Sequence, residues 1–313
     1  MYHALSEADY EREWGRLVAA LPPEHHAYFT YHKRRFYELF DSLAQHTAGL
    51  TAPLVLEVGV SGFTRLYRRL LPGIRLVTLD RPVAMYGESA AYTVGECGAE
   101  RHYNLDLNRQ PLDPTWGEPP LGQFDYVVFC EVLEHLLVSP VQVIEELLSL
   151  LRPDGLLYLT TPNFFSIHRW RQMLQRDHPQ SPLPRRGQDH AASTHFRESS
   201  MAELVSAVEQ AGGKLVHAAY SDCWEDEATR RQVADTPALW ANLVLLVSRG
   251  DSAQPPDATV EAVRATFGPL SNAERRVLGL QPLPAPSPPA SPTPGWLTRL
   301  AQRIEARHPR GRR

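Results

Sequence analysis

The sequence predicts a doubly wound α/β fold built on a mostly parallel sheet, and two observations support this prediction. From residue 53 to residue 249, short apolar runs alternate with segments of helical periodicity, and acidic residues stand where several of the runs end. Strands that alternate with helices form a parallel sheet covered on both faces. The chain has 313 residues, 43% of them hydrophobic, which is enough for one large domain with additions.

Bulk composition argues against several classes of protein. No apolar run approaches the roughly 20 residues needed to span a bilayer, and the first residues lack the basic and apolar regions of a signal peptide. Cys97, Cys130 and Cys223 are widely separated, so we expect reduced thiols, a cytoplasmic location and no metal site. Residues 296–313 carry six arginines and one glutamate, so the rest of the chain is acidic and gives no electrostatic reason to expect nucleic-acid binding.

Periodicity and caps place the elements in order. Two helices, over residues 6–20 and 24–46, make residues 1–50 an N-terminal helical cap over the strand ends. A further helix is predicted at 141–151, and Ser200 with Glu203 forms a capping box for another. Strands are predicted at 54–58, 74–79, 124–129, 156–160, 214–220 and 239–248.

This order gives five regions. Residues 51–250 form the main domain, and residues 164–197 within it are an irregular, arginine-rich segment that we expect to act as an acceptor lid. The other regions are a helical extension at 251–280, a proline-rich linker at 281–295 and a basic tail at 296–313.

The first motif with chemical meaning is LEVGVSGFTRLY, residues 56–67. Glu57 ends a strand, Gly59 follows two positions later, and a helix then begins. Glycine can adopt positive φ and lets a ligand approach the backbone, while the helix N-terminus offers free N–H groups to a carboxylate. An ordinary strand–turn–helix connection is the alternative.

Two further acids follow predicted strands. Asp80 lies 23 residues after Glu57, where a carboxylate can accept hydrogen bonds from both hydroxyls of a ribose. Asp106 follows a short strand, where it can accept a hydrogen bond from an adenine amino group while the amide of Leu107 faces a ring nitrogen. Each acid could instead be a solvated carboxylate of a strand end or a turn.

A fourth motif, FDYVVFCEVLEHL, covers residues 124–136. Glu131, Glu134 and His135 stand just past its buried strand, at the edge where open α/β sheets bind ligands. A histidine there can be a general base, or it can have a structural or substrate-orienting role. In a fifth motif, LLRPDGLLYLTTPN, a tight turn at 153–155 leads into the fifth strand.

Together these five motifs resemble the class I S-adenosylmethionine-dependent methyltransferases, most closely their small-molecule branch. The likeness extends over roughly 200 residues and continues at His195, Phe196 and Arg197. It implies a Rossmann-like seven-stranded sheet with the last strand antiparallel, and S-adenosylmethionine as the cofactor.

Position by position, the resemblance implies a cofactor site. It assigns Glu57 and Gly59 to the methionine end, Asp80 to the ribose, Asp106 and Leu107 to the adenine, and Cys130 and Glu131 to the sulfonium and amino group. One departure stands out. The family pattern E/D-x-G-x-G-x-G here has Ser61 and Phe63 at the second and third glycine positions, so Phe63 either crowds the cofactor or requires a reshaped loop.

The predicted reaction is methyl transfer to a small-molecule acceptor, with an O-methyl product in glycan or secondary metabolism. It requires alignment of donor and acceptor and exclusion of water. An oxygen acceptor also benefits from a base, for which His135, His190 and His195 are the candidates. A non-catalytic methyltransferase-like scaffold is the alternative, because of the altered glycine loop. The sequence leaves open whether the chain forms a homo-oligomer.

Overall fold

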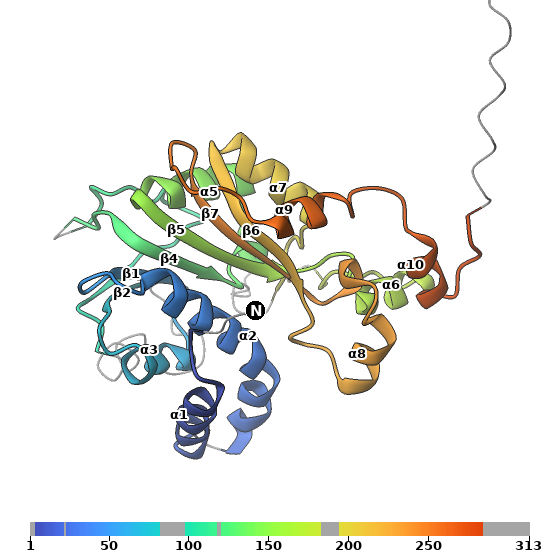
Figure 1. Cartoon of the computed structure of the whole chain (residues 1–313), viewed down its shortest axis with the longest axis horizontal. Helices are drawn as coiled ribbons and strands as arrows, with labels where there is room; N and C mark the ends of the chain where they lie inside the picture. Colours follow the sequence, from blue (N-terminus) through green and yellow to red (C-terminus); the bar gives the residue numbers. More distant parts are fainter. Residues whose placement is uncertain (1–3, 22, 82–97, 118–119, 183–193, 284–313) are drawn as a thin grey trace, which may run out of the picture.

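The computed structural model describes residues 4–21, 23–81, 98–117, 120–182 and 194–283, and it shows a single seven-stranded sheet between two layers of helices (Figure 1). The strand order is β3-β2-β1-β4-β5-β7-β6, with β7 antiparallel to both of its neighbours. The predicted doubly wound, mostly parallel sheet and its antiparallel last strand are therefore confirmed. The strands are β1 (Leu54–Val58), β2 (Arg75–Asp80), β3 (Arg101–Asn104), β4 (Phe124–Cys130), β5 (Leu151–Pro162), β6 (Gly213–Ser221) and β7 (Asn242–Arg249).

The helices divide between the two faces and one end of the sheet (Figure 1). Within the described residues, the short 3₁₀ turns η1, η2 and η3 lie in the connections. The helices and turns are α1 (Glu7–Ala19), α2 (Pro23–Thr47), η1 (Gly62–Thr64), α3 (Arg65–Leu70), η2 (Leu133–His135), α5 (Pro140–Ser149), α6 (Ile167–Leu174), α7 (Met201–Gln210), α8 (Glu227–Val233), η3 (Pro237–Leu239), α9 (Ala258–Arg264) and α10 (Asn272–Val277).

Each face of the sheet has its own hydrophobic core. On one face, α5, α7 and α9 bury residues such as Ile144, Val208 and Val260 against alternate strand positions. On the other, α1, α2 and α3 pack residues such as Phe40 and Tyr67 against the remaining positions. Side chains alternate between the faces of a strand, so fully apolar strands such as β1 serve both cores.

The reversal of strand order between β1 and β4 positions the functional site. β2 and β3 lie to one side of β1, and β4 and β5 lie to the other, all of them parallel. Crossovers then leave in opposite directions from β1 and β4, so a crevice opens beyond their carboxyl ends. Glu57, Gly59, Cys130 and Glu131 all lie at these two ends.

Several sequence predictions need correction at their boundaries. The turn predicted at 153–155 is part of β5, which begins at Leu151 and crosses an irregularity in its pairing with β4. A Cβ on Gly155 would lie 2.7 Å from the carbonyl oxygen of Phe124, so this position needs glycine. The strand predicted at 239–248 begins only at Asn242, because residues 237–239 form η3.

The segment 164–197 is not irregular throughout. Its α6 begins at the N-cap Ser166, whose hydroxyl accepts a hydrogen bond from the Arg169 amide, and it packs beside α8 and α10 in a small third cluster around Ile167 and Leu278. In the extension, α9 packs along β6. The linker beyond residue 283 and the basic tail lie outside the described residues.

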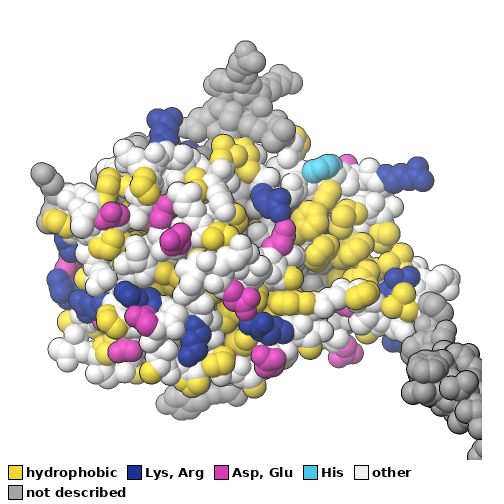
Figure 2. Space-filling model, turned by 90° about the horizontal axis from the view of Figure 1, so that it is seen from above, with side chains coloured by type: hydrophobic (Ala, Val, Ile, Leu, Met, Phe, Trp, Pro, Cys, Tyr) yellow, Lys and Arg dark blue, Asp and Glu magenta, His cyan; other side chains and the backbone are white. Residues whose placement is uncertain are grey.

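The described part of the surface carries interspersed acidic and basic side chains on the face shown in Figure 2, with hydrophobic side chains toward the side where α6 and α10 lie. Among the described helices, none combines the length and the apolar character that crossing a membrane requires.

Candidate functional site

A cavity of about 540 Å³ lies at the carboxyl ends of the parallel strands. Its wall comes from α2, the loops after β1, β2, β3 and β4, and the segments around α6 and residues 195–198. The seven positions that the resemblance assigned to the cofactor all line this one cavity. Two of the three histidine candidates, His135 and His195, line it as well, whereas His190 lies outside the described residues.

The loop after β1 closes tightly over the neighbouring strand. The amide of Gly59 donates a hydrogen bond to the carbonyl of Leu79 at 2.9 Å, and its φ is +87°. A Cβ at Gly59 would lie 2.5 Å from Cγ2 of Val132. Both the backbone conformation and the space therefore require glycine at this position.

Phe63 does not crowd the cavity. Its ring is fully buried on the opposite side of the loop, stacked on Phe36 at 3.6 Å between ring centroids and close to Phe29 and Trp14. The loop is reshaped instead: Ser61 and Thr64 form a capping box around η1. Of the two outcomes that the sequence left open, the reshaped loop is the one observed.

The displaced Gly62 is in contact with the N-terminal helical cap. A Cβ at this position would lie 2.5 Å from Cζ of Phe29. The N-terminal aromatic residues therefore press directly on the cofactor loop from behind, and the glycine lets them do so.

Two carboxylates stand at the tips of β1 and β2. Glu57 is buried, which raises the pKa of its carboxyl from 4.5 to about 8, an effect that Thr64 and Tyr67 partly offset. Asp80 accepts hydrogen bonds from the backbone amides of Arg81 at 2.7 Å and Val60 at 3.1 Å. Burial raises the pKa of Asp80, and these two amides oppose the shift. Asp80 thus joins the ends of both strands while facing the cavity.

Asp106 and Leu107 follow β3 at the next position along the cavity wall. One oxygen of Asp106 accepts a hydrogen bond from the Asn108 amide at 3.0 Å, and the other lies 3.3 Å from Arg109. The carboxylate is partly exposed toward the cavity. It can therefore still accept a hydrogen bond from a ligand.

Arg35 is a charged cavity residue that the sequence did not single out. It lies on α2, is 6% exposed, lines the cavity and stands 3.5 Å from the Glu131 carboxylate. Burial lowers the pKa of Arg35, but Glu131 and Cys130 outweigh it and the net shift is upward. Among the described residues, the buried Nε and Nη1 of Arg35 and Oε2 of Glu131 have no hydrogen-bond partner.

Two histidines meet at the far end of the cavity, with ring centroids 4.9 Å apart. Nδ1 of His135 lies 3.0 Å from the carbonyl oxygen of Thr194, which can only accept, so this nitrogen carries the proton. Nδ1 of His195 lies 2.7 Å from Oε1 of Glu198, which fixes its proton in the same way. In the neutral form of each ring, Nε2 is therefore the nitrogen without a proton. Burial lowers the pKa of His135, which keeps it neutral.

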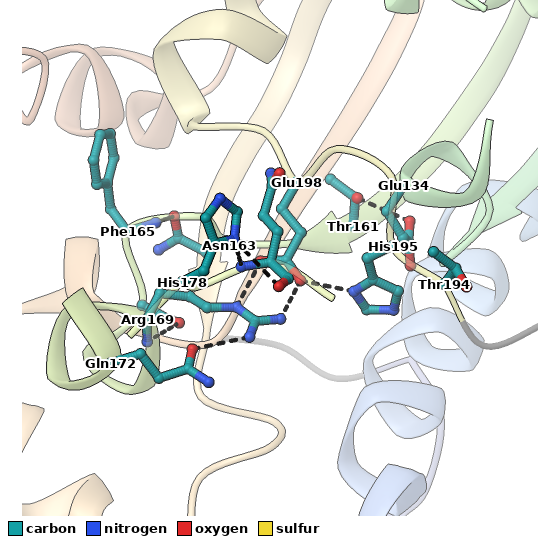
Figure 3. Close-up of polar contacts among 12 residues, drawn as sticks. Glu134, Thr161, Asn163, Phe165, Arg169, Gln172, His178, Thr194, His195 and Glu198 are labelled. Carbon is teal, nitrogen blue, oxygen red and sulfur yellow. Dashed lines mark hydrogen bonds and ion pairs between the residues drawn. The ribbon is translucent and has the colours of Figure 1, made fainter. Parts of the chain in front are cut away.

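Glu198 holds His195 in place and is itself held by Arg169 (Figure 3). Nε of Arg169 donates to Oε2 of Glu198 at 2.8 Å, and Nη2 contacts Oε1. Burial favours the neutral acid, but the contacts with His195 and Arg169 prevail and lower the pKa of Glu198. Glu198 is thus a charged carboxylate that orients the imidazole of His195.

Glu134 lies close to the two rings. It is 1% exposed and accepts a hydrogen bond from the hydroxyl of Thr161 at 3.0 Å. Burial raises its pKa well above the usual range, and Glu131 adds to the shift. The carbonyl oxygen of Glu134 accepts from the amide of Phe196 at 2.7 Å, which brings the loop of His195 to the loop of His135.

Sequence comparison identifies the family. Residues 31–218, more than half of the chain, match the family described as a methyltransferase domain. The chain belongs to this family. It is a methyltransferase that depends on S-adenosylmethionine, as the sequence predicted. No curated protein matches the sequence significantly.

Several solved structures are similar to this chain at low sequence identity. An O-methyltransferase family 2 protein from Planctomyces limnophilus, in complex with apigenin, is 14% identical, with 74% of this chain and 62% of that chain covered and a TM-score of 0.42. A methyltransferase from Mesorhizobium loti is 15% identical over 66% of this chain and 96% of that chain (TM-score 0.42). The [4+2]-cyclase SpnF is 17% identical over 68% and 80% (TM-score 0.43). These likenesses say nothing about the substrate.

The donor groups of the cavity suit S-adenosylmethionine. Its methionine end carries an ammonium and a carboxylate. The acids Glu57 and Glu131 suit the ammonium, and Arg35, whose Nε has no hydrogen-bond partner among the described residues, suits the carboxylate. Its adenosine end carries hydroxyl and amino donors, which match the carboxylates of Asp80 and Asp106.

Proposed function

We propose that this methyltransferase methylates a hydroxyl oxygen of a small molecule, of the kind handled in glycan or secondary metabolism. The observation that carries the proposal is that His135 and His195 line the same cavity as the strand-tip carboxylates, each with Nδ1 held by an acceptor, so that Nε2 is the basic nitrogen of the neutral ring. A hydroxyl acceptor has a proton to lose during transfer, and an unprotonated imidazole can receive it.

The cavity residues divide into two groups in this proposal. Asp80, Asp106 and Leu107 hold the adenosine end of the cofactor, and Glu57, Gly59, Glu131 and Arg35 hold its methionine end, with Cys130 between them. When bound, S-adenosylmethionine supplies a methyl group already activated by the sulfonium charge. The chain then needs to align the acceptor and exclude water.

The size of the cavity supports a small acceptor. About 540 Å³ lies within the range of pockets for ligands of drug size, and cofactor and acceptor must share it. The lining from α2 and α6 closes it from the side opposite the sheet, so residues 1–50 and 164–197 serve as cap and lid in this proposal.

The structure removes the reason for considering a non-catalytic scaffold. It rested on Phe63 and the missing glycines, and the packing of Phe63 against Phe36 accounts for both without loss of cavity space.

The test is methyl transfer to a panel of sugars and phenols, read by mass spectrometry. We expect an O-methyl product from the wild type and a rate about 10²–10⁴-fold lower for His195→Gln. His217→Gln is the matched control, because His217 has the same Nδ1–carboxylate contact, to Asp257 at 2.7 Å, but does not line the cavity. Equal loss in both variants, or an N-methyl product alone, would contradict the proposal.

A further inference from the structure

Three metal-binding side chains converge at the acceptor end of the cavity. One ligand atom each from Glu134, His135 and His195 lies within 4.8 Å of the other two, and Nε2 of His135 is 3.8 Å from Oε1 of Glu134. These residues come from two loops 60 positions apart, so their meeting is a product of the fold. The sequence reasoning, which considered only cysteine ligands, predicted no metal site.

The outer atoms of all three side chains are already engaged. Nδ1 of His135 donates to the carbonyl of Thr194, Nδ1 of His195 donates to Glu198, and one oxygen of Glu134 accepts from Thr161. Metal-binding histidines nearly always donate their second ring N–H to a carbonyl or carboxylate, which fixes the tautomer and the ring orientation. Here all of these supporting contacts are present. The atoms that remain available for an ion are Nε2 of each histidine and Oε1 of Glu134.

We propose that Glu134, His135 and His195 bind a divalent first-row transition-metal ion that coordinates the acceptor hydroxyl. Two imidazoles and one carboxylate suit Zn²⁺, Mn²⁺ or Fe²⁺ better than Mg²⁺, which prefers oxygen ligands. Three protein ligands leave coordination positions open, as in catalytic sites. Ligand atoms about 2.1 Å from an ion are roughly 3.4 Å apart, so the side chains draw inward by roughly 1 Å on binding.

This inference rests on the proposed hydroxyl acceptor and explains how its proton is lost. A bound divalent ion lowers the pKa of a coordinated hydroxyl, so the proton leaves to water. The freed electron pair on oxygen forms the new bond to the methyl carbon, the carbon–sulfur bond breaks, and its electron pair stays on sulfur. His135 and His195 are then ligands of the ion, and a base is not required of either.

Metal binding by the untagged, chelator-treated full chain tests the proposal. In titration calorimetry with Mn²⁺ or Zn²⁺ alone, we expect one ion per chain in the wild type and loss of this binding in His195→Ala and Glu134→Gln. His217→Ala is the matched control and should bind as the wild type does. Glu198→Gln keeps all three ligands but not the charged partner of His195, so affinity should fall by about 10–100-fold.

Two outcomes would overturn the inference: no binding by the wild type, or equal binding by wild type, His195→Ala and Glu134→Gln. Because a variant can fail for lack of folding, circular dichroism accompanies each titration. If a ligand variant unfolds, Glu198→Gln, which keeps all three ligands, carries the test, and an unchanged affinity in it would contradict the inference. Cofactor binding in the presence of chelator separates the two proposals. If the chelator-treated protein still binds S-adenosylmethionine and still forms the O-methyl product, the metal site is rejected and the proposed function is kept. If the protein binds the metal but forms no O-methyl product, the metal site is kept and the proposed function is rejected.

Discussion

The two sides of the loop after β1 carry different kinds of residues. On its inner side, Glu57, Gly59 and Asp80 line the cavity, to which the two acids bring polar groups. On its outer side, Phe63 lies in a stack of aromatic rings from α1 and α2. The two replaced glycine positions therefore differ: Phe63 packs where the loop meets the helical layer, whereas Ser61 lines the cavity. Stability and cofactor affinity should therefore respond to separate residues.

The largest expected effect belongs to the outer side. Phe63→Ala removes a fully buried ring from the aromatic stack and should lower the free energy of unfolding by about 3–5 kcal/mol. The affinity of the folded fraction for S-adenosylmethionine should stay unchanged, because the ring does not line the cavity. Urea denaturation and calorimetry measure the two quantities. Phe267→Ala, at a partly exposed position, is the control; weak cofactor binding by folded Phe63→Ala would break the comparison.

On the inner side, we expect a smaller effect, and on cofactor affinity rather than on stability. Asp80→Ala should weaken cofactor binding by about 1–3 kcal/mol, since charge-assisted hydrogen bonds to the ribose hydroxyls are lost. Its effect on unfolding should be less than that of Phe63→Ala. Asp154→Ala, at an exposed position near the amino end of β5, serves as the control. Unchanged affinity in Asp80→Ala would remove this residue from the cofactor site.

The smallest effect concerns a proton. The pKa of Glu57 is raised from 4.5 to about 8 in the folded chain, so the ligand-free protein keeps this proton at neutral pH and its stability falls as pH rises from 4.5 to 8. A cofactor cation beside Glu57 favours the ionised form, so binding at pH 7 should release a proton. Calorimetry in buffers of different ionisation enthalpy detects the release, and Glu57→Gln should abolish it. An equal release by both proteins would place the proton elsewhere.

The sequence predicts the parts of this molecule that depend on neighbours along the chain. Apolar runs locate the strands, and acids directly after them, such as Glu57 and Asp80, reach one edge because parallel strands end together. Arg35 and Glu198 could not be found in this way, since their importance comes from distant elements that fold against the strand ends. The direction of Phe63 was likewise undetermined, because it depends on the placement of α2.

Local signals were available for some of the rest. Ser166, three residues before Arg169, caps α6, and Asp226 before Thr229 caps α8. The α8 that follows carries few apolar residues, so its periodicity alone does not identify it, whereas α6 has Ile167, Trp170 and Leu174 at helical spacing. Their positions are set by the small third cluster that they build with α10.

The contact between Gly62 and Phe29 bears on where this protein can be shortened. The match to the methyltransferase family begins at residue 31, inside α2, yet Phe29 and Trp14 precede that point and press on the cofactor loop. A truncation at the family boundary would remove Phe29 and Trp14, which pack against the loop, and would expose Phe63 to water. Engineering, fusion or crystallisation work on this enzyme should treat the first thirty residues as inseparable from its catalytic half.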